Sequence, residues 1–215
     1  MRKNNTPKHP NICLTFCILY DIIYAVNRLI KLIGNWDYGY AFDTYVLSSK
    51  CIEDEFGNRK FDNTYSEIGK SLYALKYCRK KAYAKIIADS IYPKIQQIIS
   101  EHNVDLIIPI PPTNDREFQP VFEVCKCISE LTDIPYNCNI LSNKTNESVK
   151  NILPKERRSR IRIGVNYYPV KPVNILLIDD FYQTGSTATV CVNELRKIPN
   201  VKSIIYFSIV KNKNS

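Results

Sequence analysis

The sequence predicts an α/β fold in which a mainly parallel sheet is flanked by helices. Three short apolar runs rich in β-branched residues, at 104–110, 173–178 and 203–210, have the composition of strands buried on both faces of a sheet. Segments with helical spacing of apolar residues lie between these runs, and such alternation is typical of parallel sheets. With 215 residues, 45% of them hydrophobic, we expect one such domain at 64–215, preceded by an amino-terminal extension at 1–63.

The amino-terminal extension is predicted to contain a helix and a β-hairpin. Residues 12–26 are mostly apolar and follow a basic start, but no small-x-small cleavage site follows, and polar and charged residues interrupt the region too often for a transmembrane segment. We therefore expect an amphipathic or core helix there, with a helix on a membrane surface as the alternative. Two modest strand signals around the Gly57-Asn58 turn favour a hairpin within residues 42–63.

Two helices are predicted to follow the extension. Thr64 and Glu67 have the spacing of a capping box, which marks the start of the first helix. The second helix contains Pro93, which is expected to kink or divide it because proline lacks a backbone N–H. The apolar positions at helical spacing are Ile68, Leu72 and Leu75 in the first helix and Ile87, Ile91, Ile95 and Ile98 in the second.

A basic run at residues 79–81 separates these two helices and is flanked by Tyr77 and Tyr83. Positive charge beside aromatic rings is one way to bind single-stranded nucleic acid. Basic runs are also common on solvated surfaces, so a turn in solvent is the other interpretation, and we favour it.

Residues 111–119 follow the first parallel strand and are candidates for binding an anion. A tight turn there can direct backbone N–H groups at the anion, and Arg116 can grip it with two hydrogen bonds. A plain connection with a surface arginine is the alternative. A helix at 121–131, predicted from its apolar spacing, and a strand at 136–141 come next. The turn itself begins with Pro111, Pro112 and Thr113.

The clearest chemical signal lies where the strand at 173–178 ends. Asp179 and Asp180 follow it directly, and a short turn then opens a helical pattern that continues through Ile198. Backbone N–H groups at a helix start, with hydroxyl groups nearby, suit a phosphate, whereas carboxylates repel phosphate and suit ribose hydroxyls or Mg²⁺. A sugar phosphate suits both parts, because its phosphate fits the helix start and its hydroxyls fit the carboxylates. The turn and helix start contain Gln183, Thr184, Gly185, Ser186 and Thr187.

These residues resemble the phosphoribosyl-pyrophosphate (PRPP) loop of the type I phosphoribosyltransferases, in which two acidic residues precede Thr-Gly-x-Thr. The resemblance implies a type I phosphoribosyltransferase-like α/β fold. It also implies that Asp179 and Asp180 reach the ribose hydroxyls, and that residues 184–187 wrap the 5′-phosphate. Gln183 stands where some purine salvage members carry an aspartate proposed as general base, so the resemblance does not imply base assistance on a purine.

A narrower resemblance is to the competence-protein ComF family within that superfamily. Residues 71–77 are similar to its helix with a Leu-Lys-aromatic motif, and residues 106–112 to its strand ending in Pro-x-Pro. Residues 116–119 are similar to its Arg-Gly-Phe-Asn-Gln, with Glu117 for the glycine and the asparagine missing; residues 155–158 stand where the family has a Glu-Arg pair. The family's usual zinc ribbon with paired Cys-x-x-Cys is absent from the sequence.

The resemblance implies a Mg²⁺-dependent protein that binds PRPP or a nucleoside monophosphate. Asp179, Asp180 and Arg116 would act at the reacting centre, with Mg²⁺ held indirectly by the acidic pair, and residues 111–119 would form the pyrophosphate loop. The alternative is a non-catalytic ComF-like accessory protein in DNA uptake or processing. A dimer is plausible.

Residues 142–160 form a long polar and basic segment, followed by an alternating strand pattern at 161–165. In the transferases a mobile hood closes over the site at this place in the chain, which excludes water from a reactive sugar cation. A disordered basic connector is the equal alternative. The lid candidates are Lys144, Lys150 and Arg157.

Charge and cysteine content add two expectations. The net charge of +9 fits an anionic ligand or nucleic acid, and it equally fits basic residues spread over the surface. None of the eight cysteines forms Cys-x-x-Cys, which favours a reducing, cytoplasmic location over a disulfide framework. His9, Cys13 and Cys17 could share a helix face as metal ligands, but the sequence offers no evident fourth ligand.

Overall fold

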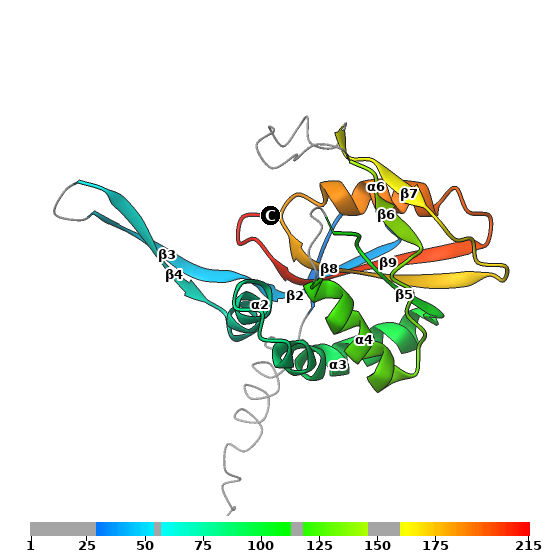
Figure 1. Cartoon of the computed structure of the whole chain (residues 1–215), viewed down its shortest axis with the longest axis horizontal. Coiled ribbons are helices and arrows are strands. Elements are labelled where there is room, and N and C mark those ends of the chain that lie inside the picture. Colours follow the sequence, from blue (N-terminus) through cyan, green and yellow to red (C-terminus); the bar gives the residue numbers. More distant parts are fainter. Residues whose placement is uncertain (1–28, 54–56, 113–117, 146–159) are drawn as a thin grey trace, which may run out of the picture.

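The computed structural model describes residues 29–53, 57–112, 118–145 and 160–215 (Figure 1). Its central sheet has five strands in the order β1–β2–β9–β8–β5. The neighbouring strands β2, β9, β8 and β5 are parallel to one another, and β1 pairs with β2 in the antiparallel sense. The predicted α/β fold with a mainly parallel sheet is therefore confirmed. The strands are β1 (Ile30–Lys31), β2 (Tyr38–Thr44), β5 (Leu106–Pro109), β8 (Val173–Tyr182) and β9 (Val201–Lys211).

Helices cover both faces of this sheet. On one face lie α2 (Glu67–Tyr77), α3 (Ala82–His102) and α4 (Pro120–Thr132) (Figure 1). The other face is covered by α6 (Ser186–Leu195) and by the antiparallel pair β6 (Leu141–Asn143) and β7 (Ile163–Val165).

The central strands have two buried faces, as the continuous apolar runs predict. Leu176 and Ile178 of β8 pack toward α2, α3 and α4, whereas Ile175 and Leu177 pack toward α6. This alternation follows from the two-residue period of a strand. It divides the core into two apolar clusters, one on each side of the sheet.

The range predicted as an extension contributes to two different parts of the molecule. The predicted hairpin is present, as β3 (Val46–Glu53) paired with β4 (Arg59–Tyr65), and it projects away from the sheet (Figure 1). However, β1 and β2 lie in the central sheet, where β2 pairs with β9. The division of the chain at residue 63 stays a prediction. The predicted helix at 12–26, with Cys13 and Cys17, lies outside the described residues, as does His9.

Several local predictions are wrong. Ser66, not Thr64, caps α2, since its Oγ accepts a hydrogen bond from the Gly69 N–H at 3.1 Å, while Thr64 belongs to β4. Pro93 does not divide α3, which is one helix through this residue, while a kink at Pro93 stays a prediction. The strand predicted at 136–141 is reduced to a single bridge at Tyr136, and pairing resumes only in β6.

The six cysteines of the described residues are all free thiols, and Cys125 and Cys191 are buried in the core. Burial raises the pKa of both thiols, so they behave as small apolar residues. Among the residues placed by the structure, no helix is both long enough and apolar enough to cross a membrane.

Candidate functional site

The acidic pair lies at the carboxyl end of β8, and its two side chains point to opposite faces of the sheet. β8 continues through the pair, because Asp179 still pairs with Ser208 of β9. The strand alternation therefore directs Asp179 to the α6 face and Asp180 to the α2 face. The hydrogen-bond partners of the two carboxylates agree with this assignment.

Asp180 forms an ion pair with Lys76 of α2. The Lys76 Nζ lies 2.8 Å from the Asp180 Oδ2, and each side chain is about one-fifth exposed. Burial alone would lower the pKa of Lys76, but the charge of Asp180 and the hydrogen bond to it raise that pKa above its ordinary value. Lys76 is therefore a fixed positive charge beside the acidic pair.

Asp179 is held by uncharged partners. Its Oδ2 accepts a hydrogen bond from the Tyr206 hydroxyl at 2.9 Å, and its Oδ1 accepts one from the Asp180 backbone N–H at 2.8 Å. Burial, and then the neighbouring charge of Asp180, raise the pKa of Asp179 from 3.8 to about 7, although both hydrogen bonds oppose the shift. Near neutral pH the pair therefore carries less than two full negative charges.

The turn after β8 brings the predicted phosphate-binding residues to the same end of the strand. Gly185 is the N-cap of α6 with φ +65°, and a Cβ there would lie 2.8 Å from the Tyr182 ring. Only glycine fits this position without strain. Thr184 is exposed, and its hydroxyl lies 2.9 Å from that of the buried Ser186.

The start of α6 is suited to an anion in its electrostatics as well. Gly185 has no side chain with which to cap the helix, and the first turn contains no acidic residue. The first turn of α6 itself therefore places no acidic side chain against an anion at the positive end of the helix dipole. Gln183 is exposed and Thr187 is half-buried beside this turn.

The predicted pyrophosphate loop begins next to the acidic pair. The backbone N–H of Ile110 donates to the Ile178 carbonyl at 2.8 Å, so the chain after β5 runs beside the residue that precedes Asp179. Pro111 is buried, and the Pro112 carbonyl accepts a hydrogen bond from the Asn143 side chain at 3.1 Å. These contacts hold the first part of the loop at the carboxyl edge of the sheet.

Four of the predicted site residues lie outside the described residues, and their roles stay predictions. They are Thr113, Arg116, Lys150 and Arg157. The third lid candidate, Lys144, is exposed just after β6, and its side chain packs over Gly164 of β7.

Mg²⁺ would need oxygen ligands beyond this chain's own carboxylates. Among the described residues there is no cluster of three or more His, Cys, Asp or Glu side chains able to hold a metal ion. The acidic pair nonetheless fits the usual way in which Mg²⁺ binds beside phosphates, with one or two carboxylates and the remaining ligands from water and substrate.

Three residues at the site were not identified as candidates from the sequence: Lys76, Tyr206 and Trp36. Lys76 follows Leu72 by four residues and so lies along the buried stripe of α2, an unusual place for a lysine without a partner. Tyr206 interrupts an aliphatic strand, and a buried tyrosine hydroxyl usually has a hydrogen-bond partner. Those two signals are visible in the sequence, whereas the position of Trp36 is not.

No protein-family model and no curated protein matches this sequence. Similar solved structures include a purine phosphoribosyltransferase from Pyrococcus horikoshii, with 17% identity and a TM-score of 0.39, covering 59% of this chain and 83% of that one. An adenine phosphoribosyltransferase from Saccharomyces cerevisiae has 11% identity and a TM-score of 0.47, covering 77% and 85%. An orotate phosphoribosyltransferase from Aeropyrum pernix has 11% identity and a TM-score of 0.42, covering 78% and 76%.

All three of these solved structures are of phosphoribosyltransferases, and each TM-score is below 0.5. The proposals below therefore depend on the geometry of this chain's own site. The narrower resemblance to the ComF family stays a prediction.

Proposed function

We propose that this protein binds PRPP or a nucleoside monophosphate at the carboxyl end of β8 and transfers the phosphoribosyl group in a Mg²⁺-dependent reaction. One observation carries the proposal. An acidic pair and a hydroxyl-rich helix start follow one another at the end of a central parallel strand, beside the end of β5. Such an edge is where open α/β sheets bind their ligands.

The two ends of the site suit the two ends of a ribose phosphate. The helix start at residues 184–187 offers backbone N–H groups and hydroxyls to the 5′-phosphate. Asp180 and Asp179 offer carboxylate oxygens to the ribose hydroxyls. Lys76 fixes the Asp180 carboxylate at the edge of the site and limits the repulsion between the pair and the ligand's phosphates.

In the proposed reaction, the bond between ribose C1 and the pyrophosphate oxygen breaks, and pyrophosphate leaves with the electron pair. A nitrogen of the acceptor forms the new bond to C1 with its lone pair, and the proton that this nitrogen carried is released to solvent. When bound, Mg²⁺ would supply positive charge to the pyrophosphate oxygens, and Arg116 would add to it. The acidic pair stabilises the positive charge that develops on the ribose ring.

Titration calorimetry of PRPP with Mg²⁺ tests the proposal. The wild-type protein is expected to bind, and the double variant Asp179→Asn, Asp180→Asn is expected to lose binding. A matched control is Asp89→Asn on α3, whose carboxylate pairs with the exposed Lys85. Binding that survives in the double variant would refute the site assignment.

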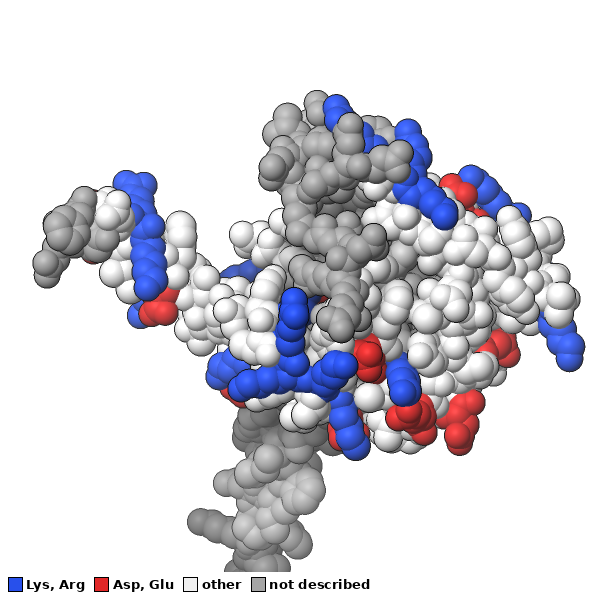
Figure 2. All heavy atoms as spheres, in the orientation of Figure 1, with Lys and Arg blue, Asp and Glu red and all other residues white. Residues whose placement is uncertain are grey.

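A second candidate function, binding of single-stranded nucleic acid, is favoured by the exposed end of α2. Tyr73 and Tyr77 are 46% and 61% exposed, with ring centroids 4.9 Å apart, and the exposed residues 79–81 follow. Figure 2 shows Lys and Arg side chains gathered over the region of α2 and α3. Exposed aromatic rings beside positive charge offer stacking surfaces to bases.

Fluorescence anisotropy with a labelled single-stranded oligonucleotide separates the two candidates. Nucleic-acid binding predicts an affinity that falls steeply with salt and is lost in the double variant Tyr73→Ala, Tyr77→Ala. A chain that ignores the oligonucleotide at low salt, while it binds PRPP, would leave only the first function.

A further inference from the structure

The turn at residues 34–37 lies between β1 and β2. It packs against Tyr206 and Gly185, which belong to the two halves of the proposed site. Trp36, the only tryptophan in the sequence, lies in this turn and is 7% exposed. Its indole N–H donates to the Leu32 carbonyl at 3.0 Å, so the buried ring has its one polar group satisfied.

Two glycines make room for this ring. A Cβ on Gly34 would lie 2.4 Å from the Trp36 ring, and a Cβ on Gly39 would lie 1.9 Å from its nitrogen. Both distances are far below van der Waals contact, so any other residue at either position would displace the indole. The spacing Gly-x-Trp-x-x-Gly therefore fixes where the ring lies.

The indole contacts both halves of the proposed site. It stacks on Tyr206, with ring centroids 4.4 Å apart, and the Tyr206 hydroxyl donates to Asp179. It meets Tyr182 edge-on at 6.3 Å, and a Cβ on Gly185 would lie 3.3 Å from its outer edge. One rigid ring thus supports the acidic pair through Tyr206 and the helix start through Gly185.

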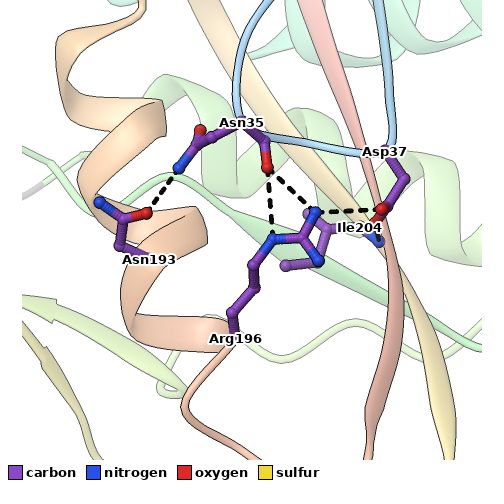
Figure 3. A network of polar contacts seen from close by, with 5 residues as sticks. All are labelled: Asn35, Asp37, Asn193, Arg196 and Ile204. Atoms are coloured by element: carbon purple, nitrogen blue, oxygen red, sulfur yellow. Dashed lines mark hydrogen bonds and ion pairs between the residues drawn. The ribbon is translucent and has the colours of Figure 1, made fainter.

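Polar contacts attach the turn to α6 and β9 (Figure 3). The Asn35 side chain donates to Asn193 at 2.7 Å, and the Asn35 carbonyl accepts from the Arg196 guanidinium at 3.0 Å. The same guanidinium lies 3.0 Å from Asp37, whose other oxygen accepts from the Ile204 backbone N–H at 2.8 Å. Because α6 and β9 are both bonded to it, the turn cannot shift without moving the helix.

We infer that Trp36 is a positioning residue that sets the helix start at the distance from the acidic pair that a ribose 5-phosphate requires. This inference rests on the proposed function. The ring touches no reacting atom; it acts by holding Gly185 and Tyr206 apart at a fixed spacing. A ligand that spans both halves depends on that spacing, whereas a ligand that uses only the β5 loop does not.

Calorimetry with ribose 5-phosphate and with pyrophosphate, both in Mg²⁺, tests the inference. Trp36→Ala is expected to weaken ribose 5-phosphate binding by about tenfold or more. It should leave the pyrophosphate affinity within about twofold of wild type, since that ligand does not span the two halves. Trp36→Phe retains a ring and should stay within about threefold of wild type for both ligands.

The outcomes separate this inference from the function on which it rests. A wild-type protein that binds neither PRPP nor ribose 5-phosphate overturns both. A wild type that binds, with Trp36→Ala binding ribose 5-phosphate equally well, overturns only the positioning role. Equal losses for both ligands would also overturn it, because they indicate general damage to the fold.

The wild-type protein itself provides a measurement if Trp36→Ala fails to fold. Since the chain has a single tryptophan, its emission reports on the ring beside Gly185. Ribose 5-phosphate is expected to change this emission in a saturable way, with the dissociation constant found by calorimetry. Emission that stays constant while calorimetry shows binding would overturn the inference.

Discussion

The two aspartates at the end of β8 are neighbours in sequence, yet the sheet places them in opposite environments. On the α2 face, Asp180 meets the ammonium group of Lys76 at 2.8 Å. On the α6 face, Asp179 accepts hydrogen bonds from the hydroxyl of Tyr206 and a backbone N–H, and its pKa rises to about 7. Two identical side chains thus have different surroundings, and burial together with the charge of Asp180 disfavours the ionised form of Asp179.

This difference teaches that the pair is not two equivalent carboxylates. Asp180 is held in place by its ion pair with Lys76, while the raised pKa of Asp179 lets that carboxylate take up a proton near neutral pH. A ligand that brings positive charge to the site, such as a Mg²⁺ complex, favours the ionised form of Asp179. The site is therefore expected to bind Mg²⁺ more tightly as the pH rises through 7, with little further gain at higher pH.

Among the single substitutions, Lys76→Met gives the largest expected effect, because it leaves the mostly buried Asp180 carboxylate without its cation. We expect a loss of about 2–3 kcal/mol in the free energy of unfolding, measured by urea denaturation. Lys70→Met on the same helix is the control, since its ion pair with Glu67 is exposed and should contribute at most about 0.5 kcal/mol. Equal losses in the two variants would mean that the Lys76–Asp180 pair contributes no more to stability than an exposed ion pair.

The pH dependence of the free energy of unfolding should reveal the raised pKa of Asp179 on the α6 face. The pKa of Asp179 is 3.8 as a free side chain and about 7 in the folded protein, so between these values the folded state binds more protons than the unfolded state. The contribution of Asp179 to the free energy of unfolding is therefore fully present below pH 4. It is lost as the pH rises through 7, by at most about 1.4 kcal/mol per pH unit.

Asp179→Asn sharpens this second prediction. The amide stays neutral, so the free energy of unfolding of the variant should change less between pH 5 and pH 8 than that of the wild type. Asp180→Asn is the matched comparison: it removes the neighbouring charge that helps to raise the pKa of Asp179 but leaves the larger cause, burial, so it should flatten the curve only in part. A wild-type curve with the same slope as that of Asp179→Asn would show that the pKa of Asp179 is not raised in the folded protein.

Tyr206→Phe removes the hydroxyl that hydrogen-bonds Asp179 while keeping the ring that stacks on Trp36. That hydrogen bond lowers the pKa of Asp179, so its loss should move the pH-dependent fall in stability to higher pH. The free energy of unfolding should decrease by about 1 kcal/mol at pH 8, measured by thermal or urea denaturation. An unchanged pH profile would mean that Tyr206 does not set the state of Asp179.

The sequence predicts the sheet and the position of the acidic pair, but not the residues that surround the pair. Apolar strands, helix spacing and the consecutive order of Asp179, Asp180 and the turn are local patterns, so the sheet and the position of the candidate site could be predicted. The partners of the two carboxylates could not, because Lys76 and Tyr206 are brought to them by packing between segments far apart in sequence. β2 escaped prediction for the same reason: its pairing with β9 spans most of the chain.

Local patterns also mislead when two residues compete for one role, as at the start of α2. Thr64 has the capping-box spacing to Glu67, but it is taken into β4, and Ser66 caps the helix instead. Since α2 positions Lys76 opposite Asp180, this cap supports the charged side of the pair. Ser66→Ala should cost about 1 kcal/mol in the free energy of unfolding. Thr64→Ala, on the exposed hairpin, should cost less than about 0.5 kcal/mol, and a larger loss from Thr64→Ala than from Ser66→Ala would restore the capping box that the sequence predicts.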